Sequence, residues 1–139
     1  MMKTAMGGRA AEQIFFNKVT TGAANDIEKI TQIARGIVMI YGMSEKFGLV
    51  NYSTGGEQYQ KPYSEATEAM IDAEVRSIVD NAYKETITLI ESKKEVAEKL
   101  ASILLEKEVI TLPDLIDCLG PRPFPMKENL REYLEEVNK

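Results

Sequence analysis

Apolar residues recur every three or four positions in at least four stretches of the chain, and this spacing constrains the fold more than any other feature. The clearest stretch runs from Ala23 to Tyr41, where apolar residues recur at spacings of three and four: Ile27, Ile30, Ile33, Ala34, Ile37, Val38 and Tyr41. The same spacing predicts helices over Ala5–Phe16, Glu65–Glu91 and Lys93–Lys107, and a shorter helix behind Thr111. The sequence therefore predicts an all-α fold, an antiparallel helical bundle with at most one short strand.

Local signals predict where several of these helices begin and end. Gly42 follows the second helix at the position where a left-handed residue usually ends one. Ser64 is placed to cap the long third helix. Ser92 and Thr111 each stand three residues before an acid, a spacing that predicts two capping boxes.

Two segments leave the prediction open. Gly7 and Gly8 weaken the first helix by about 2 kcal/mol together relative to alanine. Either another backbone packs closely against them, or the helix starts only after Gly8. The segment Phe47–Ser53 has the composition of one short strand, but no partner strand is visible in the sequence.

Composition excludes several classes of protein. The chain has no histidine among its 139 residues, so it cannot complete a Ser-His-Asp triad, a Cys-His pair or a histidine-ligated metal site by itself. The 17 basic and 22 acidic residues give a net charge of −5, which argues against nucleic acid as a partner. The single cysteine, Cys118, forms no internal disulfide and fits a reducing compartment.

Two carboxylates are candidates for a functional site. Asp26 lies four residues before Ile30, so its side chain is expected to follow the apolar face of its helix, where a carboxylate needs a cation, a metal or N–H donors. The alternative is an acid that is simply favoured in the first turn by the helix dipole. Glu12 is interpreted as a structural acid, exposed or paired with Arg9.

A series of longer motifs resembles a known family. The motifs are Gly7–Ile14 (GGRAAEQI), Thr20–Ile27 (TTGAANDI), Thr31–Arg35 (TQIAR), Tyr41–Gly48 (YGMSEKFG), Pro62–Thr67 (PYSEAT), Leu105–Glu108 (LEKE) and Gly120–Phe124 (GPRPF). In this order they resemble the peptidase domain of FtsH-type ATP-dependent zinc metalloproteases. The last motif is most similar to the mitochondrial AFG3/paraplegin-like branch.

The resemblance implies a function and a metal site. Members of the family are hexamers with membrane-spanning segments, an AAA ATPase module and a zinc peptidase domain that degrades unfolded or misassembled proteins. Zinc is held by two histidines of an H-E-x-x-H helix and by an aspartate of the Thr-Gly-Ala-x-Asn-Asp motif, which corresponds to Asp26. Glu12 matches a family glutamate that is not assigned as a ligand.

The chain departs from the family pattern because it contains no H-E-x-x-H motif. In the family that helix lies upstream, so residues 1–120 are expected to be the C-terminal part of a metallopeptidase domain, followed by a tail helix over 121–139. The chain alone is expected to hold no catalytic residue and to be inactive. Zinc would be completed by histidines absent from this chain, and ATP would bind only to the intact protein.

The remaining expectations concern partners and location. The resemblance implies a homo- or hetero-hexamer, with unfolded or membrane proteins as substrates and the membrane reached only through segments absent here. The expected location is the matrix-facing side of the mitochondrial inner membrane, with a chloroplast or bacterial membrane as the alternative. The competing hypothesis is a catalytically inactive helical module that assembles into a protease ring.

Overall fold

The computed structural model describes residues 1–53, 63–121, 123–125 and 128, and the chain divides into two compact units. Unit 1, Met1–Ser92, contains α1 (Met2–Ala11), the π-helical turn Glu12–Phe16, the 3₁₀ turn Thr21–Ala23, α2 (Ala24–Met39) and α3 (Glu65–Ser92). Unit 2, Lys93–Lys139, contains α4 (Lys94–Lys107) and α5 (Leu112–Leu119). The all-α prediction is confirmed, since the described part of the chain has helices and turns and no strand.

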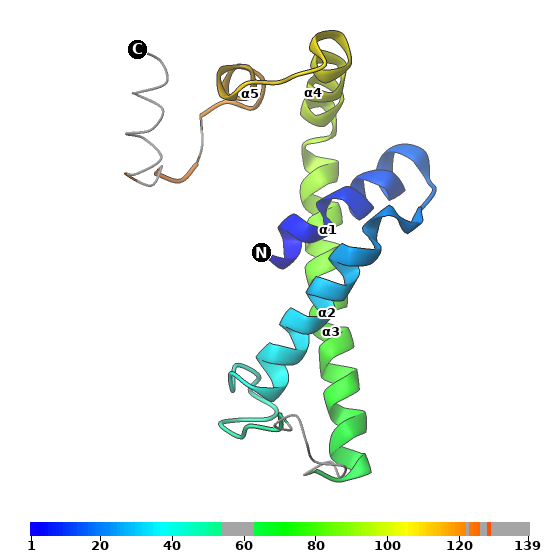
Figure 1. Cartoon of the computed structure of the whole chain (residues 1–139), viewed down its shortest axis with the longest axis vertical. Coiled ribbons are helices and arrows are strands. Elements are labelled where there is room, and N and C mark those ends of the chain that lie inside the picture. Colours follow the sequence, from blue (N-terminus) through cyan, green and yellow to red (C-terminus); the bar gives the residue numbers. More distant parts are fainter. Residues whose placement is uncertain (54–62, 122, 126–127, 129–139) are drawn as a thin grey trace. The chain divides into compact units, whose positions relative to one another are not determined.

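In unit 1 the long helix α3 supports the two shorter helices. Both α1 and α2 contact α3 and each other, and α2 and α3 run in opposite directions (Figure 1). The core cluster consists of Ala34, Val38, Phe47, Ile71 and Val75. These residues come from α2, from α3 and from the turn that follows α2, so the core of this unit lies between those elements.

The buried face of α2 is shorter than its apolar pattern suggested. Ile30, Ala34 and Val38 are buried, whereas Ile27 on the same helix is 50% exposed. Ile27 lies in the same apolar stripe, but it lines an open cavity between α1, α2 and α3, so part of its side chain stays in solvent.

Three of the predicted helix ends are confirmed. Gly42 has a φ of 60° and lies at the end of the α2 region. The Thr67 N–H donates to Ser64 Oγ at 3.2 Å, which is the hydrogen bond of an N-cap. The capping box of Thr111 and Asp114 is present at the start of α5.

The capping box predicted at Ser92 is wrong. Helix α3 continues through Ser92, whose hydroxyl donates back to Leu89 O at 2.7 Å instead of capping α4. Lys93 occupies the N-cap position of α4 and makes no side-chain capping hydrogen bond. The Ser92 hydroxyl can either cap the next helix or bond to a carbonyl oxygen in the last turn of its own helix, and sequence spacing does not reveal which of the two it does.

The short strand suggested for Phe47–Ser53 is also absent. The N–H groups of Phe47 and Gly48 both donate to Ser44 O, which closes a turn. Phe47 is buried in the core and its ring packs edge-on against Tyr52 at 5.6 Å. Burial of these aromatic rings against the helices therefore replaces strand pairing.

The first helix runs straight through its two glycines. An added Cβ at Gly7 or Gly8 would meet no atom within 4 Å among the described residues. The alternative in which the helix starts after Gly8 is therefore wrong, and no backbone of the described chain supplies the expected close approach. The loop at 54–62 and the helix expected at the C-terminus lie largely outside the described residues. Within those residues, no helix has the length and apolarity needed to cross a membrane.

Candidate metal centre

Asp26 lies in the first turn of α2, as the third residue of that helix. Its side chain is 43% exposed, and its Oδ1 lies 3.8 Å from Lys29 Nζ one turn further on. The expectation that Asp26 avoids solvent is thus only half met. The first buried residue within α2 is Ile30, one turn later, so Asp26 lies on a less completely covered part of the helix.

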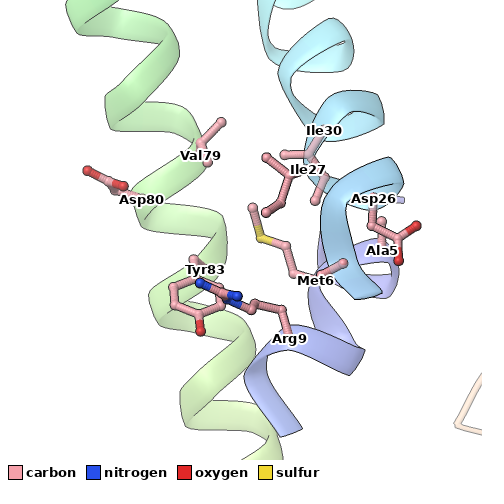
Figure 2. Close-up of a pocket in the computed structure, with 10 residues that line it drawn as sticks. Ala5, Met6, Arg9, Asp26, Ile27, Ile30, Val79, Asp80 and Tyr83 are labelled. Atoms are coloured by element: carbon pink, nitrogen blue, oxygen red, sulfur yellow. The ribbon is translucent and has the colours of Figure 1, made fainter. Parts of the chain in front are cut away.

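An apolar cavity of about 210 Å³ opens between the three helices of unit 1, with Asp26 at its edge. It is lined by Ala5, Met6, Arg9, Ala23, Asp26, Ile27, Ile30, Val79, Asp80 and Tyr83. Figure 2 shows Met6, Ile27 and Ile30 facing the interior, whereas the Asp26 carboxylate is directed outward beside Ala5, away from Tyr83. The carboxylate is therefore accessible from outside the described chain.

Glu12 binds the segment that leads into α2. Its two carboxylate oxygens accept hydrogen bonds from the Thr20 backbone N–H at 3.0 Å and from the Thr20 hydroxyl at 2.7 Å. These bonds, more than the nearby Arg9, hold the pKa of Glu12 below its ordinary value. The structure confirms a structural role for Glu12, but its principal partner is Thr20 and not Arg9.

Arg9 contributes to the same segment from α1. Its guanidinium donates to the Thr20 carbonyl oxygen at 3.3 Å. The Thr20 hydroxyl in turn accepts from the Gly22 N–H at 3.3 Å, which caps the 3₁₀ turn Thr21–Ala23. The contacts of Thr20 to Glu12 and Arg9 join residues 8 and 11 positions apart, so no local sequence pattern reveals them.

Helix α3 holds the α1 region through two polar contacts. The Tyr83 hydroxyl donates to Gln13 Oε1 at 2.6 Å, and Lys3 forms an ion pair with Glu85. Both contacts fix the helical segment that carries Arg9 and Glu12. The edge of the cavity is therefore built from all three helices of unit 1.

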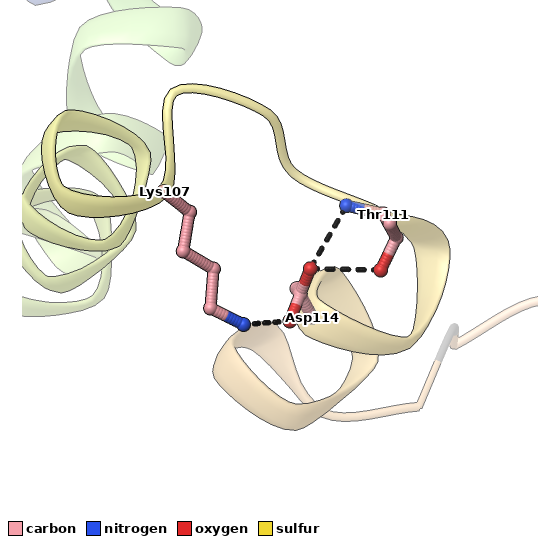
Figure 3. Close-up of polar contacts among 3 residues, drawn as sticks. All are labelled: Lys107, Thr111 and Asp114. Carbon is pink, nitrogen blue, oxygen red and sulfur yellow. Dashed lines mark hydrogen bonds and ion pairs between the residues drawn. The ribbon is translucent and has the colours of Figure 1, made fainter.

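Unit 2 contains its own polar cluster around Asp114. Asp114 accepts from the Thr111 N–H at 3.0 Å and hydroxyl at 2.7 Å, and its other oxygen lies 2.6 Å from Lys107 Nζ (Figure 3). The hydrogen bond from Lys107, followed by those from Thr111, strongly lowers the pKa of Asp114. The cluster fastens α5 to the end of α4.

The described residues form no complete metal site of their own. No group of three or more cysteines, aspartates or glutamates within the described ranges is arranged to hold a metal ion, and the sequence has no histidine. Cys118 is half-buried, with its Sγ 3.9 Å from the Val96 carbonyl oxygen. Asp26 can therefore supply one anionic ligand to a metal only together with donors from another segment.

Comparison with known proteins places the chain in a family. Residues 1–118 match Peptidase family M41. The chain is 44% identical over 137 residues to the mitochondrial inner membrane m-AAA protease component AFG3L2 of Mus musculus, covering 96% of this chain and 17% of that protein. It is 48% identical over 123 residues to the ATP-dependent zinc metalloprotease FTSH 10, mitochondrial, of Arabidopsis thaliana, covering 88% and 15%.

A bacterial relative shows a similar match. The chain is 44% identical over 128 residues to the ATP-dependent zinc metalloprotease FtsH of Rhodothermus marinus, covering 88% of this chain and 18% of the relative. The chain thus spans less than a fifth of the length of each of these three relatives. Because the family match covers residues 1–118 of 139, this chain belongs to Peptidase family M41.

Proposed function

We propose that residues 1–120 form the C-terminal part of the peptidase domain of a membrane-anchored, ATP-dependent zinc metalloendopeptidase that degrades unfolded or misassembled proteins. The family match and the names of the relatives, which include ATP-dependent zinc metalloproteases, support this proposal. Its role in that domain is to supply the third zinc ligand, Asp26, and a helical scaffold. The chain alone contributes no catalytic side chain.

The observation that carries the proposal is the position of Asp26. A zinc ligand from a second segment needs an ionised carboxylate that is reachable, anchored on a rigid element and not occupied by a close cation. Asp26 is half-exposed, stands in the first turn of α2 and has its nearest cation at 3.8 Å. The donor chemistry of Asp26 therefore fits zinc, with two histidines from a segment of the longer protein completing the set.

The described residues would orient the ligand and shape its surroundings. Helix α2 fixes the Asp26 backbone, and the apolar side chains of Met6 and Ile30 border the cavity beside it. When bound, zinc would supply an activated water for peptide hydrolysis. Asp26 would hold its negative charge toward the metal on the outer side of α2, where its carboxylate is accessible.

The names of the relatives support a proposal for assembly and location. Three relatives are named as components of the mitochondrial inner membrane m-AAA protease, and we extend this location to the intact protein, with the peptidase part facing the matrix. The intact protein would form a homo- or hetero-hexamer, bind ATP in a separate module and act on unfolded or membrane proteins.

A second candidate function is a catalytically inactive helical module that assembles into a protease ring. The absence of histidine from all 139 residues favours it, since the chain cannot complete the zinc site by itself. The two candidates differ in whether Asp26 ever contacts a metal.

The test is the Asp26→Asn substitution in the intact protein, with zinc content, proteolysis and ATP hydrolysis measured together. We expect zinc and proteolysis to fall at least tenfold, because an anionic ligand is lost, while ATP hydrolysis persists. Glu28→Gln is the matched control, since Glu28 is an exposed acid on the same helix and is expected to change nothing. Full zinc and full proteolysis in Asp26→Asn would refute the proposal.

A further inference from the structure

We infer that Glu12 is a positioning residue for Asp26, acting through Thr20; this inference rests on the proposed role of Asp26 as a zinc ligand. Glu12 does not share an element with Asp26. It opens the π-helical turn Glu12–Phe16 that follows α1, whereas Asp26 belongs to the first turn of α2. The connection between them is the short segment from Thr20 to Ala24.

Thr20 uses all of its hydrogen-bonding groups. Its N–H and hydroxyl donate to the two oxygens of Glu12, its carbonyl oxygen accepts from Arg9, and its hydroxyl oxygen also accepts from the Gly22 N–H. An exposed residue with four such contacts has little freedom to rotate. Glu12 and Arg9 therefore fix both the position and the orientation of Thr20.

No free linker separates Thr20 from Asp26. The 3₁₀ turn Thr21–Ala23 follows Thr20 directly and runs into α2 at Ala24. Ala23 is buried, with an exposed fraction of 7%, so packing of its side chain also holds the turn in place. A shift of Thr20 is therefore passed on to the first turn of α2, where the ligand carboxylate is located.

The need for a carboxylate at Glu12 follows from the two donors it faces. One oxygen receives the Thr20 N–H and the other receives the Thr20 hydroxyl. A glutamine has only one acceptor oxygen and presents an NH₂ group in place of the other, opposite a donor. Glu12→Gln thus keeps only one of the two contacts and places a donor against a donor at the other, while keeping the shape of the side chain.

Asp114 provides an internal control. It accepts hydrogen bonds from the N–H and hydroxyl of Thr111 through one oxygen and contacts Lys107 through the other, within a local cluster of unit 2. Asp114→Asn removes the carboxylate charge of this cluster without changing a residue that contacts Thr20. A loss of zinc binding specific to Glu12 would therefore not come from lost stability alone.

The experiment compares variants of the intact, zinc-loaded protein. Zinc affinity is measured by competition with a chelator, and the visible absorption spectrum of the Co²⁺-substituted protein reports ligand geometry. We expect Glu12→Gln and Thr20→Val to weaken zinc binding about 10–100-fold and to alter the Co²⁺ spectrum, as outer-shell losses do. Thr20→Ser keeps the hydroxyl that Thr20→Val lacks, so its zinc affinity is expected to be near-native. Asp114→Asn is also expected to have near-native zinc affinity.

The outcomes separate this inference from the proposed function. Native zinc affinity and Co²⁺ spectrum in Glu12→Gln and Thr20→Val, with zinc lost in Asp26→Asn, would overturn only the positioning role. Equal weakening in Glu12→Gln and Asp114→Asn would also overturn it, since the effect would then follow stability. Normal zinc binding in Asp26→Asn would overturn the proposed function itself. Thr20→Val keeps the test decisive if Glu12→Gln fails to fold, because valine is nearly isosteric with threonine.

Discussion

The buried Ser44 hydroxyl donates a hydrogen bond to Glu74 Oε1 at 3.1 Å and so ties the turn after α2 to α3. The second oxygen of Glu74 lies 2.5 Å from Lys46 Nζ in the same turn. The Glu74 side chain is only 14% exposed, so it is more shielded from solvent than the ion-paired side chains of Asp26 and Glu85. This pair of contacts holds Phe47 in the core, because Phe47 lies one residue beyond Lys46.

Glu74→Gln is predicted to lower the free energy of unfolding by about 1–2 kcal/mol at pH 7, because a charge-assisted hydrogen bond is lost. The hydrogen bond from Lys46, helped by that from Ser44, lowers the pKa of Glu74 below its ordinary value of 4.5. A depressed folded-state pKa adds stability that is complete above pH 4.5 and is lost as the pH falls through the folded value. Urea unfolding of both proteins should therefore show a difference that shrinks below pH 4.5.

The control for this prediction is Asp72→Asn, which changes an exposed acid on the same helix. Asp72→Asn should have nearly the same free energy of unfolding as the unmodified protein, both at pH 7 and below pH 4.5. If Glu74→Gln cost the same at pH 3 as at pH 7, the ionised form of Glu74 would not be the stabilising species.

Val38→Ala is predicted to cost roughly 2 kcal/mol of unfolding free energy, because Val38 is fully buried and its removal leaves a cavity. Ile27→Ala removes more atoms, but half of that side chain is already exposed, so we expect a loss below about 1 kcal/mol. Thermal or urea unfolding of the two variants checks the order. A larger loss for Ile27→Ala would mean that the cavity lined by Ile27 is covered in solution.

Gly8→Ala and Gly42→Ala are predicted to act in opposite directions. Alanine at Gly8 would meet nothing within 4 Å inside a helix and should stabilise unit 1 by about 0.5–1 kcal/mol. Alanine at Gly42 would need a φ of 60° and would approach Gly48 O to 3.1 Å, so it should destabilise by about 1–2 kcal/mol. Unfolding curves of both variants test this, and a destabilising Gly8→Ala would reveal a close contact at α1.

The purified 139-residue chain is predicted to show no peptidase activity. It has no histidine, and within the part of the chain that the structure describes no cluster of side chains is suited to hold a metal. Casein cleavage with and without added zinc is the measurement. Zinc-dependent cleavage that a chelator abolishes would show that this chain completes a metal site in some other way.

Much of the secondary structure could be predicted because it depends on residues close together in sequence. The spacing of apolar residues predicted α2 and α3 to within a few positions, and Gly42, Ser64 and Thr111 marked helix ends through contacts only a few residues long. The motif around Thr20–Ile27 also singled out Asp26 as a candidate ligand. Each of these signals is local, so no knowledge of packing was needed.

Only the tertiary structure decided which side chains meet across the chain. Phe47 was expected in a strand, but its burial between α2 and α3 favours a turn closed by Ser44. Glu12 was expected to be exposed or paired with Arg9, whereas the return of the chain brings Thr20 within hydrogen-bond distance. Helix periodicity fixes the face on which a residue lies, but the partner on that face depends on how the helices pack, and packing energies are summed over residues far apart in sequence.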